Sequence, residues 1–321
     1  MGGQEPQTRI ACGALDSIGY FQRMRGYLGE MFPIPRHAVL AVLAALGIAG
    51  FTRTVHGVAA PLGPGPVLAA AWNVFAMLLI LRLMDEIKDE DIDRELFPER
   101  PLPSRRVRKS DIILSLAATI TVYLVANAHS LTVLVSAVVV LGYALLMFKR
   151  FFAPQLLRRS LPVTLATHTP VIPLIWVQAF AVLTDAYHVP LANLHWCPIA
   201  LYVVMLWLAV VSWEVARKIR PLQEETEYVT YSRLLGATGA IGVVATLQTA
   251  AMLIAASLYF QYGLRVPYLV LMAAGWTVCG WVYVRFLTAP APRADTLKSA
   301  ALSFIIAVLL AQVYGFVLAH P

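Results

Sequence analysis

Long apolar segments, separated by short polar ones, run through almost the whole chain. Windows of about 20 apolar residues, enough for a helix to cross the hydrocarbon core of a bilayer, recur between residues 36 and 319. They cover residues 36–57, 65–84, 110–127, 131–148, 161–184, 197–215, 234–259, 266–288 and 299–319. The pattern predicts an all-α, polytopic membrane protein whose bundle contains about nine transmembrane helices.

The fifth window and the segment before the first window depart from this simple pattern. Three prolines interrupt the fifth window, at Pro162, Pro170 and Pro173, so we expect a kink there. Before the first window, apolar residues recur at near-helical spacing between residues 14 and 30, with Arg23 and Arg25 among them, which is typical of an interfacial amphipathic helix. We therefore expect an N-terminal segment, residues 1–35, and one transmembrane domain, residues 36–321.

Composition points to the same class of protein. Of the residues, 59% are apolar and 13% are charged, with a mean hydropathy of +0.71, whereas soluble domains carry about 25% charged residues. The net charge of +7 comes from an uneven distribution: of the 25 lysines and arginines, all but Arg53 and Arg265 fall on one side of the nine predicted helices. The positive-inside rule makes that side cytoplasmic. We expect a multi-pass protein of the plasma membrane that binds no nucleic acid.

The end of the second window carries a dense acidic segment, residues 85–93. Asp85, Asp89 and Asp93 are spaced i, i+4 and i+8, so they share one face if the helix continues. Three like charges in a row repel each other unless cations lie between them. Mg²⁺ is commonly held by one or two carboxylates together with substrate phosphates. The segment is either such a metal site or a solvated acidic loop at a helix end.

A basic segment follows, with the sequence Arg100-Pro101-Leu102-Pro103-Ser104-Arg105-Arg106. Guanidinium groups match phosphate oxygens with paired hydrogen bonds, so a metal and an anion could bind here together. For Arg100, anion binding and a role in membrane orientation are both open. For Arg105, Arg106, Arg108 and Lys109 we favour the role in orientation.

These two segments resemble the first signature of the UbiA superfamily of intramembrane prenyltransferases. That signature reads N-D-x-x-D-x-x-x-D, followed by R-P-L-P-S. Here Asp85 stands at the usual asparagine, Glu86 at the first acid, and Asp89 and Asp93 at the next two acids, and residues 100–104 match outright. Nine helices, with motifs after the second and the sixth, also resemble the family.

Two weaker matches follow. Tyr143 with Lys149-Arg150 resembles a family motif at the end of the fourth helix. The segment 213–236 resembles the second acidic motif, usually D-x-x-x-D, although here Glu214 is followed at i+4 by Lys218. Three arrangements are open for this half of the site, namely Glu214 alone holding a second metal, Glu214 joined by Glu224 or Glu225, or replacement of that metal by Lys218 with Arg217.

The resemblance implies Mg²⁺-dependent transfer of a prenyl group from an allylic prenyl diphosphate to an aromatic or other lipophilic acceptor, with release of diphosphate. It assigns catalysis and metal binding to Asp85, Asp89, Asp93 and Glu214, with Glu224 and Glu225 as further metal candidates. It assigns the diphosphate to Arg100, Tyr143, Lys149, Arg150, Arg217 and Lys218. A terpene cyclase acting on the diphosphate alone is the alternative enzyme. A transporter is less favoured, because the charges gather at one membrane face rather than at the midplane.

Polar and aromatic residues inside the windows supply further candidates. His168 either contacts or deprotonates the acceptor, or binds a carbonyl freed by Pro170 or Pro173. Trp176 and Trp213 are candidates for the acceptor or carbocation cavity, and packing against lipid or protein is their alternative role. Four amides inside the windows are expected to hydrogen-bond between helices: Asn73, Gln178, Gln248 and Gln312.

Overall fold

The computed structural model describes residues 19–225, 230–289 and 293–318, and the elements within these ranges are helical. Nine of the described segments are long and apolar enough to cross a membrane. They are α3 (Ile34–His56), α4 (Pro64–Lys88), α6 (Lys109–Asn127), α7 (Leu131–Phe148), α9 with α10 (Leu161–His168 and Val171–Ala186), α11 (Trp196–Ala216), α12 (Tyr231–Tyr262), α13 (Val266–Thr288), and α14 (Ala294–Val313) continued by the π-helical turn η4 (Tyr314–Leu318). The predicted all-α fold and its nine membrane-spanning helices are confirmed.

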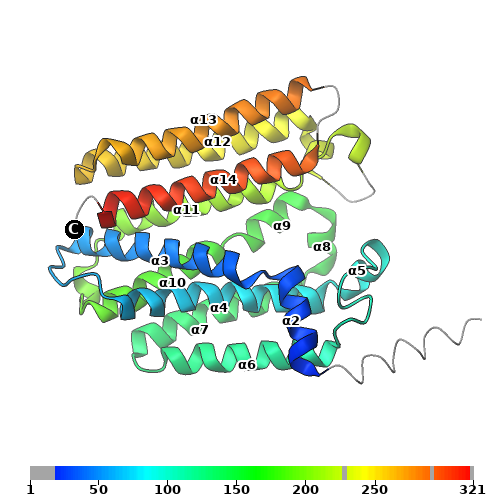
Figure 1. The fold of residues 1–321 in the computed structure, drawn as a ribbon, viewed down its shortest axis with the longest axis horizontal. Coiled ribbons are helices and arrows are strands. Elements are labelled where there is room, and N and C mark those ends of the chain that lie inside the picture. Colours follow the sequence, from blue (N-terminus) through cyan, green and yellow to red (C-terminus); the bar gives the residue numbers. More distant parts are fainter. Residues whose placement is uncertain (1–18, 226–229, 290–292, 319–321) are drawn as a thin grey trace, which may run out of the picture.

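The long helices run side by side, and the short elements gather at one end of the bundle (Figure 1). These short elements are α2 (Tyr20–Met31), α5 (Glu90–Leu96), η1 (Arg150–Phe152), α8 (Pro154–Arg159) and η3 (Leu222–Glu224). That end carries the predicted charged segments, and we call it the charged end. A further short helix, η2 (Leu191–Asn193), belongs to the opposite end.

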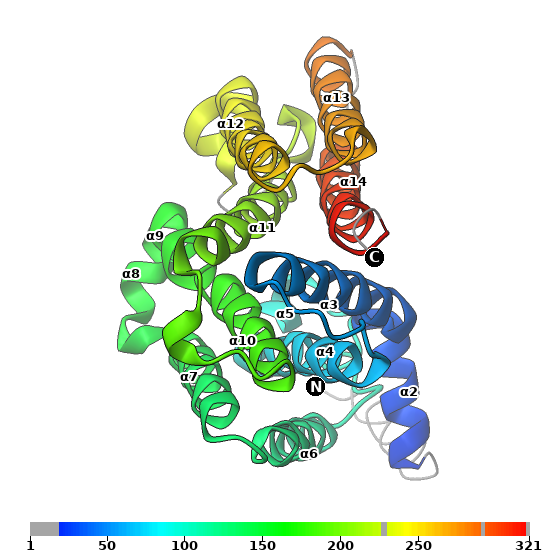
Figure 2. The ribbon, with the colours of Figure 1, turned by 90° about the vertical axis from the view of Figure 1, so that its left-hand side faces the viewer.

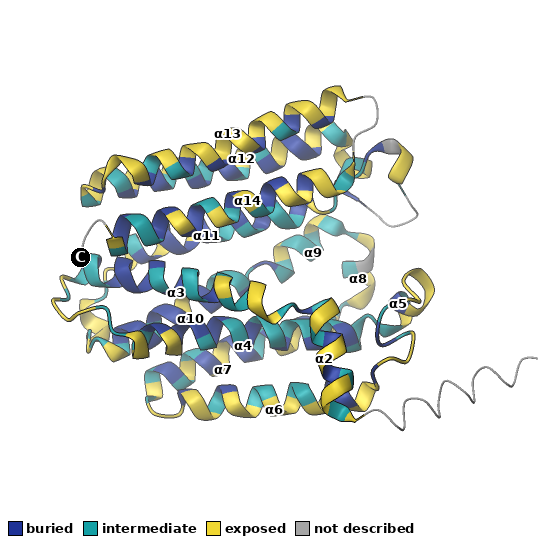
Figure 3. Ribbon diagram, in the orientation of Figure 1, coloured by how far each residue is buried: buried dark blue, intermediate teal, exposed yellow. Residues whose placement is uncertain are grey.

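Viewed along the helices, α3, α4, α6, α7 and α10 form one group and α11 to α14 form another (Figure 2). Contacts of α14 with α3 and of α10 with α11 join the two groups. In the most apolar window of α3, α4 and α11, 56% of residues are buried, against 22% in α6 and 28% in α13. The outward faces of the peripheral helices are exposed and apolar (Figure 3), which fits a protein that is solvated by lipid.

The kink predicted in the fifth window is present. Helix α9 ends at His168, and α10 begins at Val171 after a turn at Thr169 and Pro170. Proline has no backbone N–H to continue the ladder of hydrogen bonds. The turn places α9 beside the charged end while α10 packs against α4 and α7.

Buried side-chain amides connect helices in the interior, as predicted. The Asn73 oxygen on α4 accepts hydrogen bonds from Asn127 on α6 and from Gln178 on α10, both at 2.7 Å. The Tyr123 hydroxyl donates to the Gln178 oxygen at 2.5 Å. In a bilayer interior these groups have no water to bind, so the network favours one alignment of the three helices.

The other group of helices has two similar connections. The Tyr283 hydroxyl on α13 donates to the Gln248 oxygen on α12 at 3.0 Å. Gln312 on α14 donates to the Tyr268 hydroxyl on α13 at 3.2 Å. All four amides that the sequence indicated therefore take part in hydrogen bonds between helices.

The N-terminal helix α2 docks on the charged end of the bundle. Arg23 donates two hydrogen bonds to Asp111 on α6, at 2.7 and 2.8 Å. Met24 and Tyr27 are buried in a small apolar cluster that also contains Leu83 of α4. Phe21 remains 85% exposed, on the face away from these contacts. The predicted helix is present from Tyr20, whereas residues 14–18 of that prediction lie outside the described residues, and its place at the membrane interface stays a prediction.

Candidate active site

The acidic row crosses the end of α4, and the helix bends at its centre. Asp89 lies between α4 and α5 with φ −103° and ψ 10°. Backbone hydrogen bonds from Asp89 N to Asp85 O, at 2.9 Å, and from Asp93 N to Asp89 O, at 2.8 Å, continue the i+4 pattern across the bend. The expected straight face is therefore replaced by a bent one, which places the three carboxylates in different surroundings.

Each acid of the row has a different basic neighbour. Asp85 pairs with Lys88 at 2.6 Å and remains about half exposed, with 49% of its side chain accessible. Asp93 is buried and pairs with Arg100 at 2.6 Å. Asp89 lies between them, 3.4 Å from the Arg150 guanidinium.

Asp89 has the most unfavourable surroundings for a negative charge. Burial raises the pKa of its carboxyl above the usual value, and the charges of Asp85 and Asp93 act in the same direction. Lys88 and Arg150 oppose this rise in the pKa without cancelling it. Burial therefore disfavours the charged form of Asp89 in spite of these two cations.

Glu86 stands beside the row but faces the N-terminal helix. It is 1% exposed, pairs with Arg82 one turn earlier on α4, and accepts a hydrogen bond from the Tyr27 hydroxyl at 3.4 Å. The motif had not pointed to Arg82 or Tyr27. The available signal was an arginine inside an apolar span, four residues before an acid.

The R-P-L-P-S segment forms a compact turn that holds Arg100 over the row. The Ser104 hydroxyl donates to the Arg100 carbonyl at 2.6 Å, and Arg106 N donates to the Pro101 carbonyl at 2.8 Å. Leu102 anchors the turn in the small cluster beneath α2. The Arg100 guanidinium lies 4.0 Å from the centre of the Phe97 ring and pairs with Asp93. The segment therefore positions an arginine as well as contributing to the charge of this end.

Arg106 has a specific structural partner. It donates hydrogen bonds to both carboxylate oxygens of Glu30, at 2.6 and 3.1 Å, and to the Glu99 carbonyl at 2.5 Å. Residue 30 belongs to α2, so this pair ties the N-terminal helix to the turn. The prediction that Arg106 only marks orientation was incomplete.

The chain leaves α7 through a left-handed turn. Arg150, Phe151 and Phe152 have φ values of 52°, 50° and 57°, a region that costs non-glycine residues about 1–3 kcal/mol each. The turn directs the Arg150 guanidinium to the Lys88 carbonyl at 3.2 Å and to Asp89 at 3.4 Å. Strained backbone thus brings an arginine to the centre of the acidic row.

The two other residues of this weaker motif lie elsewhere. Lys149 is exposed, with its ammonium 5.7 Å from the centre of the Phe148 ring. The Tyr143 hydroxyl donates to the Thr167 carbonyl at 2.9 Å and so ties α7 to α9. Of the three predicted diphosphate ligands in this motif, Arg150 is the one that the structure brings to the acids.

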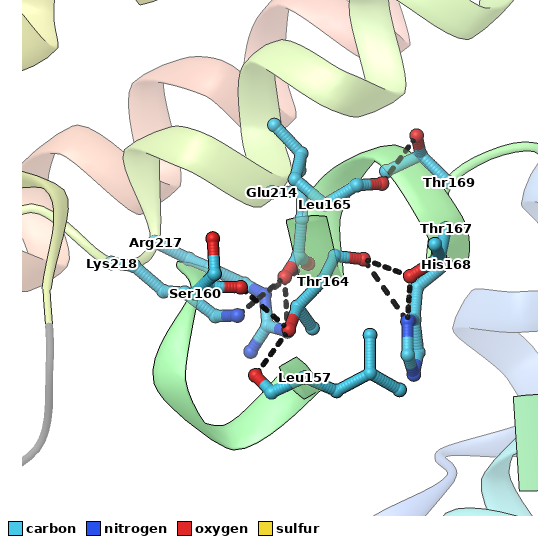
Figure 4. A network of polar contacts seen from close by, with 10 residues as sticks. All are labelled: Leu157, Ser160, Thr164, Leu165, Thr167, His168, Thr169, Glu214, Arg217 and Lys218. Carbon is cyan, nitrogen blue, oxygen red and sulfur yellow. Dashed lines mark hydrogen bonds and ion pairs between the residues drawn. The ribbon is translucent and has the colours of Figure 1, made fainter. Parts of the chain in front are cut away.

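The second half of the site lies at the end of α11. Glu214 accepts two hydrogen bonds from Arg217, at 2.5 and 2.7 Å, and its Oε1 lies 3.1 Å from the Lys218 ammonium (Figure 4). The Arg217 guanidinium also lies 5.4 Å from the centre of the Trp213 ring. This group is one carboxylate held by two cations.

The later glutamates have other roles in the fold. The Glu225 carboxylate accepts hydrogen bonds from the hydroxyls of Thr230, at 2.7 and 2.8 Å, and Ser232, at 2.5 Å. Thr230 in turn caps α12, and Gly236 then turns the chain with φ 70°, which glycine tolerates. Glu224 is exposed. The Thr…Leu-Gly part of the motif therefore stabilises the start of α12.

His168 is the last residue of α9. Its Nδ1 is 3.0 Å from the Thr164 carbonyl and 3.1 Å from the Thr167 hydroxyl (Figure 4). A carbonyl only accepts hydrogen bonds, so this contact places the proton on Nδ1 and leaves the lone pair on Nε2. The charges that act on the ring include those of Asp85, Lys88 and Lys218. The carbonyl that it contacts is not one of those freed by the prolines.

The indole groups of Trp176 and Trp213 lie in apolar surroundings. Both pack against the main apolar core. Their Nε1 atoms are buried and have no hydrogen-bond partner within the described part of the chain. Buried donors without a partner are uncommon in folded proteins, so both remain candidates for contact with a bound molecule.

The bundle resembles solved structures of UbiA proteins. A UbiA homologue from Aeropyrum pernix K1 shares 19% identity with this chain at a TM-score of 0.67, over 88% of this chain and 98% of that one. A structure of digeranylgeranylglyceryl phosphate synthase shares 17% identity at a TM-score of 0.61, over 92% and 99%. The chain has the UbiA fold. No family model and no curated protein sequence matches it.

The two halves of the site differ in how well they suit Mg²⁺, the ion that the UbiA fold implies. Among the described residues, no three histidine, cysteine, aspartate or glutamate side chains form a ready-made metal site. Asp85 and Asp89 nevertheless suit a Mg²⁺ ion that takes one or two carboxylates and completes its shell with phosphate oxygens and water. The group around Glu214 does not suit a second ion, because its single carboxylate is already neutralised by Arg217 and Lys218.

Proposed function

We propose that this protein is a Mg²⁺-dependent intramembrane prenyltransferase, which moves a prenyl group from an allylic prenyl diphosphate to an aromatic or other lipophilic acceptor. One observation carries the proposal. At the charged end of a UbiA-type bundle, the row Asp85–Asp93 holds Arg100 and Arg150 beside it, and the charges of both this row and Lys218 act on His168. Such an arrangement suits the binding of a diphosphate at the charged end of the bundle.

The basic residues beside the row bind and orient the diphosphate in this proposal. Arg150 is held by the left-handed turn next to Asp89, and Arg100 by the compact turn next to Asp93. Guanidinium groups fixed in this way stabilise the charge that develops on the leaving diphosphate without having to reorganise. Mg²⁺, when bound by Asp85 and Asp89, would neutralise part of the same charge.

The chemical step is a substitution at the allylic carbon. The bond between that carbon and the diphosphate oxygen breaks, and its electron pair leaves with the diphosphate. The acceptor supplies the electron pair of the new bond and loses a proton. We assign that proton to His168 Nε2, because the contact of Nδ1 with the Thr164 carbonyl leaves Nε2 as the basic nitrogen.

The orientation in the membrane belongs to the same proposal. The charged end carries most of the lysines and arginines, so the positive-inside rule places it, and the diphosphate with it, in the cytoplasm. A plasma membrane with the donor supplied from the cytoplasm is consistent with this orientation. Labelling of single introduced cysteines from either side of sealed vesicles tests it.

The enzymatic test uses membranes that contain the protein, labelled prenyl diphosphates of increasing chain length, and candidate acceptors. We expect a prenylated acceptor and released diphosphate, both abolished by EDTA. Asp89→Ala and Asp93→Ala should abolish release, whereas Asp91→Ala should retain it, because the Asp91 side chain is 97% accessible. Release at the normal rate by the first two variants would refute the proposed site.

The same assay separates the other candidate functions. Cyclised hydrocarbon or alcohol formed from the donor alone would identify a terpene cyclase instead. Movement of an unmodified substrate across the vesicle membrane, with no chemical product, would identify a transporter. Both outcomes contradict prenyl transfer, and the presence or absence of a chemical product distinguishes them.

A further inference from the structure

We propose that the second half of the diphosphate site contains no metal ion, and that Lys218 and Arg217, held in place by Glu214, bind the diphosphate oxygens directly. The inference rests on the proposed function, because it concerns how the same substrate is held. It assigns one metal-binding half and one cationic half to the site.

The first observation is that both carboxylate oxygens of Glu214 already contact cations. Arg217 approaches Oε2 at 2.5 Å and Oε1 at 2.7 Å, and the Lys218 ammonium approaches Oε1 at 3.1 Å. A metal ion at this carboxylate would have to displace these groups or lie beside two like charges. Either arrangement is unfavourable because the side chains of Glu214 and Lys218 are only 20% and 14% accessible to water.

The second observation is that, among the residues that the structure describes, no other acid completes a metal site around Glu214. Lys218 stands at the i+4 position, in the turn that follows the end of α11 at Ala216, and contacts Glu214 from there. Glu225 is engaged by the hydroxyls of Thr230 and Ser232, and Glu224 is exposed. Mg²⁺ that is bound through protein usually has one or two carboxylates available to it, and here the one carboxylate is neutralised.

The third observation is the opposite charge of the two halves. The segment 85–93 contains six carboxylates and one lysine, with Arg100 and Arg150 beside it, and so keeps an excess of negative charge, whereas the group at the end of α11 contains one carboxylate and two cations. A diphosphate between them needs cations on both sides. The acidic row supplies them by attracting a divalent ion, and the other half already carries them as side chains.

The fourth observation is that the Lys218 ammonium is well placed and held. Its side chain is 14% accessible, and its backbone is tied to α12 by a hydrogen bond from Tyr231 N to the Lys218 carbonyl at 3.0 Å. An ammonium has three donors, and the contact with Glu214 uses one of them. The charge of Lys218 also acts on His168, as do the charges of Asp85 and Lys88.

The test counts metal ions on purified full-length protein in lipid nanodiscs. Mn²⁺ replaces Mg²⁺, inorganic diphosphate serves as the probe, and electron paramagnetic resonance measures bound Mn²⁺ per chain. We expect one Mn²⁺ per chain for the parent protein. Two ions per chain with magnetic coupling between them would overturn the inference.

Two variants of Lys218 test whether this residue excludes the second metal ion and whether it binds the diphosphate. Lys218→Asp recreates an acidic pair with Glu214, so we expect its count to rise to two. Lys218→Gln should leave the count at one and weaken diphosphate binding about 10- to 100-fold, as expected for loss of a charged hydrogen bond. The matched control is Lys298→Gln, an exposed lysine at the start of α14, which should change neither quantity.

The outcomes distinguish this inference from the proposed function. A parent protein that binds one Mn²⁺ with diphosphate but never transfers a prenyl group would refute the function and support the inference. A parent that transfers prenyl groups and binds two Mn²⁺ would do the reverse. If Lys218→Asp does not fold, as judged by size-exclusion chromatography, the parent count and Lys218→Gln still decide. Unchanged diphosphate affinity in Lys218→Gln would refute direct binding by this lysine.

Discussion

The contact between α3 and the C-terminal π-helical turn leaves no space for a side chain at Gly50. A Cβ atom at this position would lie 2.6 Å from the Phe316 carbonyl oxygen and 2.8 Å from its carbonyl carbon. Both are backbone atoms, which cannot rotate away as a flexible side chain can. Gly50→Ala must therefore push α3 and η4 apart or shift the turn.

The size of the effect follows from these distances. Ordinary van der Waals contact begins near 3.4 Å, so the closest pair must separate by roughly 0.8 Å in a close-packed interior. Overpacking of this kind typically costs about 1–3 kcal/mol. Alanine also gains about 0.5–1 kcal/mol over glycine inside a helix, which acts in the opposite direction.

Gly142→Ala is the matched control, because Gly142 lies inside α7 with no atom within 4 Å of its added Cβ. The helix gain is common to both variants, so their difference isolates the overlap. We expect Gly50→Ala to have a free energy of unfolding about 1–3 kcal/mol lower than Gly142→Ala. Unfolding in mixed micelles with increasing sodium dodecyl sulfate, followed by circular dichroism, measures both. Equal stabilities would refute the close approach of α3 and η4.

Three other substitutions test the site and its supports. Asp89→Asn removes a charge that burial disfavours, since burial raises the pKa of that carboxyl. In EDTA the variant should be more stable than the parent at pH 7 but not at about pH 3, where the parent carboxyl is protonated. An equal gain in stability at both pH values would contradict this account. Asp111→Asn weakens the two hydrogen bonds from Arg23. Trypsin should then cleave within α2 roughly tenfold faster, as expected for loss of about 1.5 kcal/mol of the stability of its docking. An unchanged cleavage rate would show that other contacts hold the helix. Tyr123→Phe leaves the Gln178 oxygen without the hydroxyl that donates to it. The free energy of unfolding in mixed micelles should fall by about 0.6–1.7 kcal/mol. No change would mean that this hydrogen bond between α6 and α10 does not stabilise the protein.

Several parts of the site could be predicted because their signal is local. Asp85, Asp89 and Asp93 share a spacing that the backbone hydrogen bonds preserve. The kink at Pro170 follows from a missing backbone donor. The buried amides had to find partners because the bilayer offers none. In each case the physical cause lies within one helix turn or in the solvent, so the sequence pattern contains it.

Other parts depend on contacts between distant segments. Arg150 reaches Asp89 across 61 positions of sequence, and Arg23 reaches Asp111 across 88. The bend at Asp89 and the left-handed turn at 150–152 also have no clear sequence signal, because neither contains glycine or proline. Packing of neighbouring helices favours these conformations, and packing is invisible to spacing alone.

The sequence by itself determined the class of protein, the number and limits of the spans, and the end at which the charges gather, because the bilayer selects for apolar length and for the side of basic residues. The tertiary structure decided which charges meet. It placed Arg150 and Arg100 on the acidic row, gave Glu225 to Thr230 and Ser232, and left Glu214 with Lys218 and Arg217. An ion pair depends on where two side chains lie in space, and only the packed helices determine that.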